Sequence, residues 1–174
     1  MKAGGGETHV VVGILSDSHG DAEATARAVR LLESRGATAL FHCGDICGER
    51  VLDELAGRQA YFVWGNCDDP CPQLHSYVAA LGLPWPNPSE RISLGGKRIA
   101  MYHGHEREFP NALADGTLDY VFFGHSHRRE DRRDGGPRAI NPGALYRATV
   151  KSIALLDLAR DGLTFLDLDG RLLK

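Results

Sequence analysis

The first half of the chain alternates short apolar runs with amphipathic segments. A β-branched run over residues 9–15 fits a strand that is buried on both faces of a sheet. Asp21 is placed to cap a helix over residues 22–34, and Gly36 follows the end of that helix. The same alternation predicts a strand over 38–41, a helix over 49–55 and a strand over 59–64. This order indicates a mostly parallel sheet with right-handed crossovers.

The second half is richer in hairpin patterns. A short helix over 73–81 precedes a proline-rich link, and another over 110–114 precedes an apolar strand over 120–123. Glycine-containing turns join three pairs of predicted strands, over 91–94 and 97–102, 128–133 and 138–140, and 152–158 and 163–168. Residues 141–143 predict a turn. A parallel half followed by a hairpin-rich half predicts an α/β fold in which two sheets pack face to face, with helices outside.

Polar clusters follow five of these strands. The strand over 120–123 stops at Gly124 and then presents His125 and His127. Residues two apart on an extended backbone point the same way, so we expect these two histidines to address one site. In open α/β sheets, ligands bind beyond the carboxyl ends of the strands. The other clusters at such ends contain Asp17 and His19, Asp45, Asn66, and His103.

Together the clusters offer four histidines, two carboxylates and one amide oxygen, which is about the number of ligands that two metal ions need. Nitrogen and oxygen donors without thiolate suit Mn, Fe, Co, Ni or Zn rather than Ca or Mg. Asp45 lies between the flanking clusters and is the candidate bridging ligand. Each residue taken alone also has an ordinary interpretation as a helix cap, a turn residue or a half-buried histidine. Their joint position at strand ends favours the metal site.

Length and composition set outer limits on function. The 174 residues suit one domain, predicted over 9–174, and the polar, glycine-rich residues 1–8 predict a flexible tail and no signal peptide. A formal charge of −3 is too small to indicate a nucleic-acid or membrane surface. A cytoplasmic location is the default expectation. The four cysteines form two C-x-x-x-C pairs, which we interpret as reduced thiols rather than as a zinc site or a disulfide framework.

The series of clusters resembles the calcineurin-like metallophosphoesterase superfamily, and within it the small bacterial and archaeal phosphodiesterase branch. The match extends from the first strand to Gly143, and the series of five blocks is specific although each block alone is not. The matching blocks are Asp17-Ser18-His19, Gly44-Asp45, Gly65-Asn66-Cys67-Asp68, His103-Gly104-His105 and Gly124-His125-Ser126-His127.

The resemblance implies a four-layer α/β/β/α sandwich of two mixed β-sheets flanked by helices. It implies two divalent transition-metal ions as cofactors, with Mn expected first and Ni, Co, Fe or Zn as the others. One ion would be held by Asp17, His19, Asp45 and His127, and the second by Asp45, Asn66, His103 and His125.

Cys67 departs from the wider superfamily, in which many members carry a histidine that contacts the phosphate and protonates the leaving group. A thiol with an ordinary pKa of about 8.5 is a poor substitute for imidazole in that role. The small phosphodiesterase branch shares the Gly-Asn-Cys-Asp sequence, so Cys67 favours that branch. The general acid stays unassigned, with His75, His105 and a metal-bound water as candidates, and we count Asp45, Asn66, Cys67 and His105 as the candidate catalytic residues.

The resemblance implies hydrolysis of a small phosphodiester, with a hydroxide that bridges the two metals as nucleophile and no covalent enzyme intermediate. A phosphomonoesterase acting on phosphoproteins or nucleotides is the alternative enzyme, and Cys67 argues mildly against it. A non-catalytic protein-binding scaffold of the same fold is the alternative from another class. Relatives often self-associate, which admits a homo-oligomer.

Two further segments have open interpretations. The charged hairpin over residues 128–134 either guides an anionic substrate or is a solvated surface hairpin. Trp85 and the prolines of residues 84–88 form either a lid or an oligomer contact.

Overall fold

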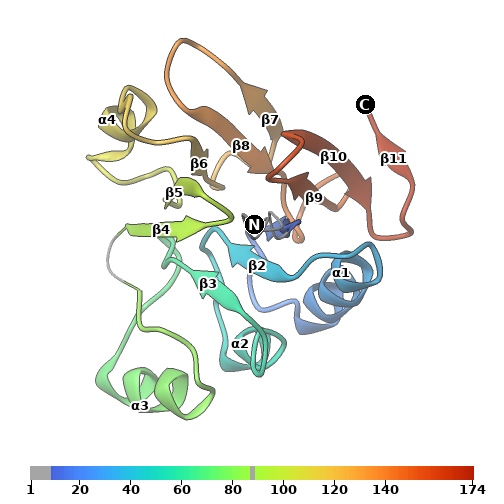
Figure 1. The fold of residues 1–174 in the computed structure, drawn as a ribbon. Coiled ribbons are helices and arrows are strands. Elements are labelled where there is room, and N and C mark those ends of the chain that lie inside the picture. The colour runs from blue at the N-terminus through green and yellow to red at the C-terminus, as the bar shows by residue number, and fades with distance from the viewer. Residues whose placement is uncertain (1–8, 87–88) are drawn as a thin grey trace, which may run out of the picture.

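A computed structural model describes residues 9–86 and 89–174, which form two mixed β-sheets with helices on their outer faces (Figure 1). The predicted tail over 1–8 and part of the predicted segment over 84–88 lie outside the described residues. Within those described parts, no helix combines the length and apolar character that crossing a membrane requires.

The first sheet has the strand order β11-β10-β9-β1-β2-β3. Three parallel strands form one half of it, as the sequence predicts: β1 (Val11–Leu15), β2 (Ala39–His42) and β3 (Ala60–Phe62). An antiparallel half continues from β1 through β9 (Ser152–Asp157), β10 (Gly162–Asp167) and β11 (Leu172–Leu173). The strand β11 has no counterpart in the sequence prediction, because two leucines are too short a pattern to be recognised.

The second sheet has the order β4-β5-β6-β8-β7. Its parallel centre consists of β5 (Lys97–Met101), β6 (Tyr120–Phe122) and β8 (Arg138–Pro142). Antiparallel edges are added by β4 (Glu90–Leu94) and β7 (Arg129–Arg132), which belong to two of the predicted hairpins.

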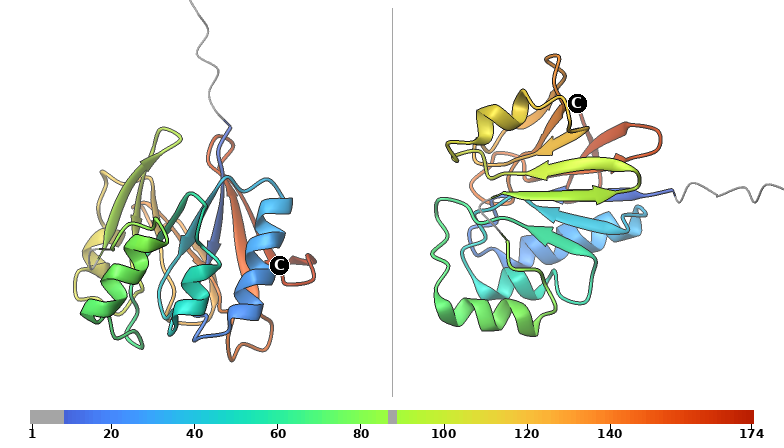
Figure 2. Two further views of the ribbon diagram at one scale, coloured as in Figure 1. Left: turned by 90° about the horizontal axis from the view of Figure 1, so that it is seen from below. Right: turned by 60° about the vertical axis from the view of Figure 1, so that its left-hand side comes forward.

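Helices cover the outer face of each sheet. On the first sheet lie α1 (Ala22–Ser34), α2 (Glu49–Asp53) and α3 (Pro72–Ala80), whose buried side chains share one apolar cluster with that sheet. The short α4 (Phe109–Leu113) packs on the second sheet through Ala112, next to Ala100 and Val121. The right-hand view of Figure 2 shows α4 on one side of the strands and α1 to α3 on the other. The predicted four-layer α/β/β/α sandwich is confirmed.

The core between the two sheets comes from alternate residues of their strands. Val12 and Ile14 of β1 and Phe41 of β2 face Ile99 and Phe122 of the second sheet in one buried cluster. Phe41 and Phe122 meet edge to face with ring centroids 5.1 Å apart, the arrangement that aromatic quadrupoles prefer. This core fixes the two sheets side by side, so the loops at their strand ends are brought together.

One turn prediction is wrong. Asn141 and Pro142 are the last residues of β8 and pair with Glu130 and Arg129 of β7, so the turn begins only at Gly143, with φ +86°. The reason lies in the buried Asn141 side chain, whose amide donates to the Gly124 carbonyl at 2.7 Å. The same side chain accepts from the Gly143 backbone N–H at 2.9 Å, so Asn141 connects the neighbouring loop to its own turn from within the strand. Elsewhere the predicted element ends differ from the observed ones by one or two residues.

Candidate metal centre

Loops that follow strands of both sheets converge at one end of the molecule. Asp17 and His19 follow β1, Asp45 follows β2, and Asn66 lies beyond β3, all in the first sheet. His103 follows β5, and His125 and His127 follow β6, in the second sheet. Backbone hydrogen bonds tie the loops together, from Asp17 N to the Gly44 carbonyl at 3.0 Å and from Gly124 N to the His103 carbonyl at 2.9 Å. The sheet packing therefore gathers all seven predicted ligands at one end.

Five of these seven residues have left-handed backbone. Their φ angles are +53° at Asp17, +43° at His19, +51° at Asp45, +66° at His125 and +57° at His127. Such angles are uncommon for residues other than glycine and cluster at functional sites. They also correct the prediction for His125 and His127, which lie in a bend and not on extended backbone. The two residues reach the same loop cluster because the chain turns there.

Three glycines allow the loops to approach this closely. A Cβ at Gly124 would lie 2.0 Å from Ser16 Oγ and 2.7 Å from Asp17 Oδ2, and one at Gly65 would lie 2.1 Å from Asp45 Oδ1. A Cβ at Gly44 would lie 2.6 Å from His103 Nδ1. Any side chain at these positions would displace a candidate ligand.

Asp17, His19 and His127 form the first compact group of donor atoms. His127 Nε2 lies 3.2 Å from Asp17 Oδ1 and 3.4 Å from His19 Nε2. Asp17 is fully buried, its Oδ1 has no hydrogen-bond partner among the described residues, and burial raises the pKa of its carboxyl. A buried carboxylate oxygen without a donor is costly unless a cation satisfies it.

His103 and Asn66 form the second group around Asp45. His103 Nε2 lies 3.1 Å from Asn66 Oδ1 and 3.4 Å from Asp45 Oδ2. The other nitrogen, His103 Nδ1, lies 2.8 Å from the Cys43 carbonyl. Because a carbonyl only accepts, Nδ1 carries the proton and Nε2 is left to present its lone pair to an ion.

Asp45 connects the two groups. Its Oδ2 lies 3.4 Å from both His19 Nε2 and His103 Nε2, while Oδ1 accepts from the Cys67 backbone N–H at 2.9 Å. Burial alone would raise the pKa of Asp45, but the adjacent His103 imidazole and the hydrogen bond from the Cys67 backbone N–H hold it well below its ordinary value. An ionised carboxylate that faces donors on both sides fits a ligand shared by two cations.

His125 takes a more peripheral position. Its ring is exposed and packs against the His103 ring at 5.0 Å, and its backbone N–H lies 3.2 Å from Asp17 Oδ2. Its ring nitrogens belong to none of the compact donor groups that the described residues form.

The donors as a whole fit divalent transition-metal ions, since they combine imidazole nitrogen with carboxylate and amide oxygen around an unsatisfied buried carboxylate.

Comparison with protein families identifies the family in which this arrangement of donors occurs. The model of the calcineurin-like phosphoesterase superfamily domain matches residues 10–161. The chain belongs to the calcineurin-like phosphoesterase superfamily.

Relatives place this phosphoesterase with the small archaeal and bacterial phosphodiesterases. Phosphodiesterase MJ0936 of Methanocaldococcus jannaschii is 24% identical over 158 residues, which cover 84% of this chain and 92% of that protein. The structure of the phosphoesterase YfcE from Escherichia coli matches with a TM-score of 0.74 and 25% identity, over 95% of this chain and 97% of that one. Vps29 of Entamoeba histolytica in complex with Zn²⁺ has the same fold, with a TM-score of 0.63 and 24% identity over 94% of this chain and 96% of that one.

The phosphoesterase site opens into a cavity of about 350 Å³, which reveals two residues that the sequence analysis missed. Tyr146 and Arg147 line it together with His19, Asp45, Asn66, Cys67, His125 and His127. The Tyr146 ring lies 5.3 Å from the His19 ring, and the Arg147 guanidinium lies 5.1 Å from the centre of the Tyr146 ring. The sequence marks these two residues only by their position after β8. This strand is the sixth whose end lies at the phosphoesterase site.

Two half-buried carboxylates, to which the sequence analysis assigned no role, hold the phosphoesterase loops in shape. Asp68 accepts from the backbone N–H groups of Gly65 at 2.7 Å and Cys47 at 2.7 Å. Glu106 accepts from those of His103 at 2.6 Å and Gly104 at 2.7 Å. Each carboxylate thereby fixes the backbone beside a candidate ligand.

Cys67 and the two side-chain candidates for the general acid, His105 and His75, differ in position. Cys67 lines the cavity, and desolvation and the nearby Asp45 raise the pKa of its thiol. His105 is exposed, with its ring 5.3 Å from the His103 ring and 6.2 Å from the His125 ring. His75 lies on α3 and packs against Trp85 at 4.7 Å. Neither His105 nor His75 lines the phosphoesterase cavity.

Proposed function

We propose that this phosphoesterase is a metal-dependent phosphodiesterase that binds two divalent transition-metal ions. The observation that carries the proposal is Asp45, one oxygen of which lies at equal distances of 3.4 Å from His19 and His103. Asp17, His19 and His127 would join it at one ion, and Asn66, His103 and His125 at the other. Mn²⁺ is the ion expected first, and Ni, Co, Fe and Zn are the ions to compare with it.

The two ions, when bound, would supply a hydroxide nucleophile by lowering the pKa of water, and would offset the charge on the phosphate oxygens. The chain itself holds the geometry. The Cys43 carbonyl and the Cys67 N–H orient His103 and Asp45, and Gly44, Gly65 and Gly124 leave room for the ligands. Asn66 presents an amide beside the cavity, where it can also donate to a phosphate oxygen.

Two observations bear on the general acid. Cys67 lines the cavity, but a thiol with an ordinary pKa of about 8.5 is a poor substitute for imidazole as the acid. The His105 ring lies 5.3 Å from the ring of the candidate ligand His103, whereas His75 packs against Trp85. We therefore infer that His105 is the better side-chain candidate, and that His75 is not the acid.

A protein-binding scaffold is the alternative from another class, and the fold shared with Vps29 is the observation in its favour. Asp17, with its buried and unpaired oxygen, supports a bound cation, which the metal-dependent enzyme requires. The phosphomonoesterase alternative, the cytoplasmic location and a homo-oligomer stay as predictions.

Metal analysis and turnover test the proposal. The purified chain is expected to bind about two transition-metal ions and to hydrolyse bis(p-nitrophenyl) phosphate in a Mn²⁺-dependent reaction. The variants Asp17→Ala and His127→Ala should each lose about one ion and nearly all turnover. Asp169→Ala, at an exposed ion pair with Arg27, is the matched control and should change neither.

Other results would contradict the proposal. Full activity in Asp17→Ala would refute the ligand assignment. Faster hydrolysis of p-nitrophenyl phosphate than of the diester would favour the monoesterase. A chain that binds no metal and hydrolyses neither compound with Mn²⁺, Ni²⁺, Co²⁺ or Zn²⁺ would favour the scaffold.

A further inference from the structure

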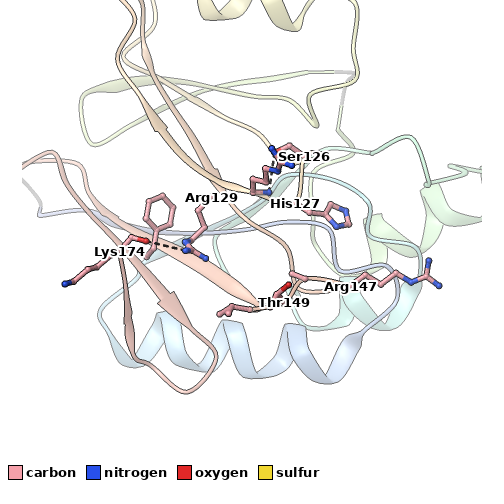
Figure 3. A pocket seen from close by; sticks show the side chains of 10 residues that line it. Ser126, His127, Arg129, Arg147, Thr149 and Lys174 are labelled. Carbon is pink, nitrogen blue, oxygen red and sulfur yellow. Dashed lines mark hydrogen bonds between the residues drawn. The ribbon is translucent and has the colours of Figure 1, made fainter.

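A second and larger cavity adjoins the candidate metal centre. It has a volume of about 670 Å³, in the range that small-molecule ligands fill. His127 and Arg147 line both this cavity and the smaller one at the metal centre, so the two spaces share a wall. Figure 3 shows His127 and Arg129 on one segment and Arg147 and Thr149 together on the loop across from it. A molecule bound at the metal centre would therefore lie next to this cavity.

The charged side chains that line this second cavity are cationic. Arg128, Arg129, Arg147 and Lys174 are among its ten lining residues, and none of the ten is Asp or Glu. Such a lining attracts an anion, and arginine matches the geometry of phosphate oxygens. The remaining wall includes the half-buried ring of Phe165 and the exposed Val150, which offer an apolar surface beside the charges.

The arginine side chains in and near this cavity differ in whether they already have hydrogen-bond or ion-pair partners. Farther along β7 and its turn, Arg132 pairs with Glu130 at 3.3 Å and Arg133 pairs with Asp161. Arg129 donates to the backbone carbonyl of Lys174 at 3.3 Å, as the dashed line in Figure 3 marks. Within residues 9–86 and 89–174, by contrast, Arg128 and Arg147 form no ion pair. Neither guanidinium is therefore neutralised by a described carboxylate, although that of Arg147 packs over the Tyr146 ring.

We propose that this cavity binds a second phosphate of the substrate, so that the preferred substrates are phosphodiesters with a further phosphate on one ester group. Arg128 and Arg147 bind that phosphate, and the apolar wall at Phe165 receives the organic group between the two phosphates. This inference rests on the proposed phosphodiesterase function and adds the substrate class to it. A simple aryl diester reaches the metal centre but leaves the second cavity empty.

A matched pair of substrates tests the proposal. Thymidine 5′-(p-nitrophenyl phosphate) and its 3′-phosphorylated form have the same reacting diester and the same leaving group. The 3′-phosphorylated compound is expected to have a kcat/KM about tenfold higher, because it adds charge-assisted hydrogen bonds to guanidinium. The ratio should fall toward one in Arg128→Gln and in Arg147→Gln, and at high ionic strength. Arg30→Gln, at an exposed arginine of α1, is the matched control and should keep the wild-type ratio.

Binding without turnover separates the cavity from the chemistry. Thymidine 3′,5′-bisphosphate should bind to the EDTA-treated protein about tenfold more tightly than thymidine 5′-monophosphate in calorimetry, and Arg128→Gln should remove the difference. Metal-dependent hydrolysis of both substrates with a ratio near one would overturn this inference and leave the proposed function intact. A ratio that Arg128→Gln does not change would also overturn it. If neither substrate is hydrolysed, the proposed function fails. The difference in binding between the bisphosphate and the monophosphate then tests by itself whether the cavity binds a second phosphate.

Discussion

Gly124 shows how single residues shape the candidate centre. The residue lies where β6 has ended, and its missing side chain leaves space that Ser16 Oγ and Asp17 Oδ2 occupy. Gly116 has no heavy atom within 4 Å of its Cβ position, and neither glycine has a positive φ. The two positions differ in their surroundings rather than in their backbone, so they form a matched pair.

Gly124→Ala is expected to lower the free energy of unfolding by about 1–3 kcal/mol, because the new methyl group overpacks a rigid loop junction. It should also weaken metal binding, since Asp17 must shift. Gly116→Ala should change stability by less than about 1 kcal/mol, with a gain as the expected direction. Urea unfolding and metal titration of the two variants measure this. Equal stability of the two would show that the loops adjust freely.

Arg138 of β8 is the element-scale feature that connects the two sheets away from the metal centre. Its side chain is 8% exposed, and its Nε and Nη2 donate to the two carboxylate oxygens of Asp131 on β7 at 2.7 and 2.9 Å. Its Nη1 donates to the Asp161 carbonyl at 2.6 Å, in the turn between β9 and β10. One arginine therefore joins an edge hairpin of the second sheet to a hairpin of the first.

This cluster predicts a dependence of stability on pH. Burial would raise the pKa of Asp161, but hydrogen bonds from Arg133, Tyr120 and Arg138 lower it to about 2. A depressed pKa stabilises the fold above the ordinary value near 4, and this contribution is lost as the pH falls through the folded value near 2. Unfolding free energy should therefore decrease more between pH 5 and pH 2 in the wild type than in Asp161→Asn. Parallel curves for the two proteins would contradict the assignment.

The sequence predicts the secondary-structure elements more completely than it predicts the residues of the candidate site. The helix α1 has a capping Asp21 and a regular apolar face, so its bounds were predicted correctly. The seven ligand positions follow strand ends, which local patterns reveal, but their left-handed backbone does not follow from the pattern. Tyr146 and Arg147 reach the site only because β8 lies beside β6 in the second sheet. Such placement depends on pairing between distant strands, and single-sequence patterns do not specify it.

At the scale of the whole molecule, the candidate centre lies across the junction of the two sheets. Asp17, His19, Asp45 and Asn66 come from loops of the first sheet, whereas His103, His125 and His127 come from the second. Elsewhere the sheets are held mainly by the apolar core around Phe41 and Phe122. Ions bound at the centre would add a link between the sheets at the end where the loops are.

Metal removal and addition should therefore change the stability of the entire fold. At about 100 times the dissociation constant, a ligand specific to the folded state adds about 2.7 kcal/mol. For a domain of this size, such a gain raises Tm by roughly 5–10 °C. Differential scanning calorimetry of the EDTA-treated chain with and without Mn²⁺ measures the shift, and Asp17→Ala should lose most of it. An unchanged Tm would indicate that the ions do not connect the sheets.

The left-handed backbone at five proposed ligands has a consequence for laboratory evolution. Such a conformation costs an L-residue roughly 1–2 kcal/mol, and asparagine or glycine tolerates it better than histidine does. Replacing His19 or His127 by asparagine would therefore relieve strain while abolishing the site, a conflict between stability and activity. A selection for heat resistance that does not also demand turnover would be expected to accumulate substitutions at these positions first, and its survivors would be folded, heat-resistant and inactive.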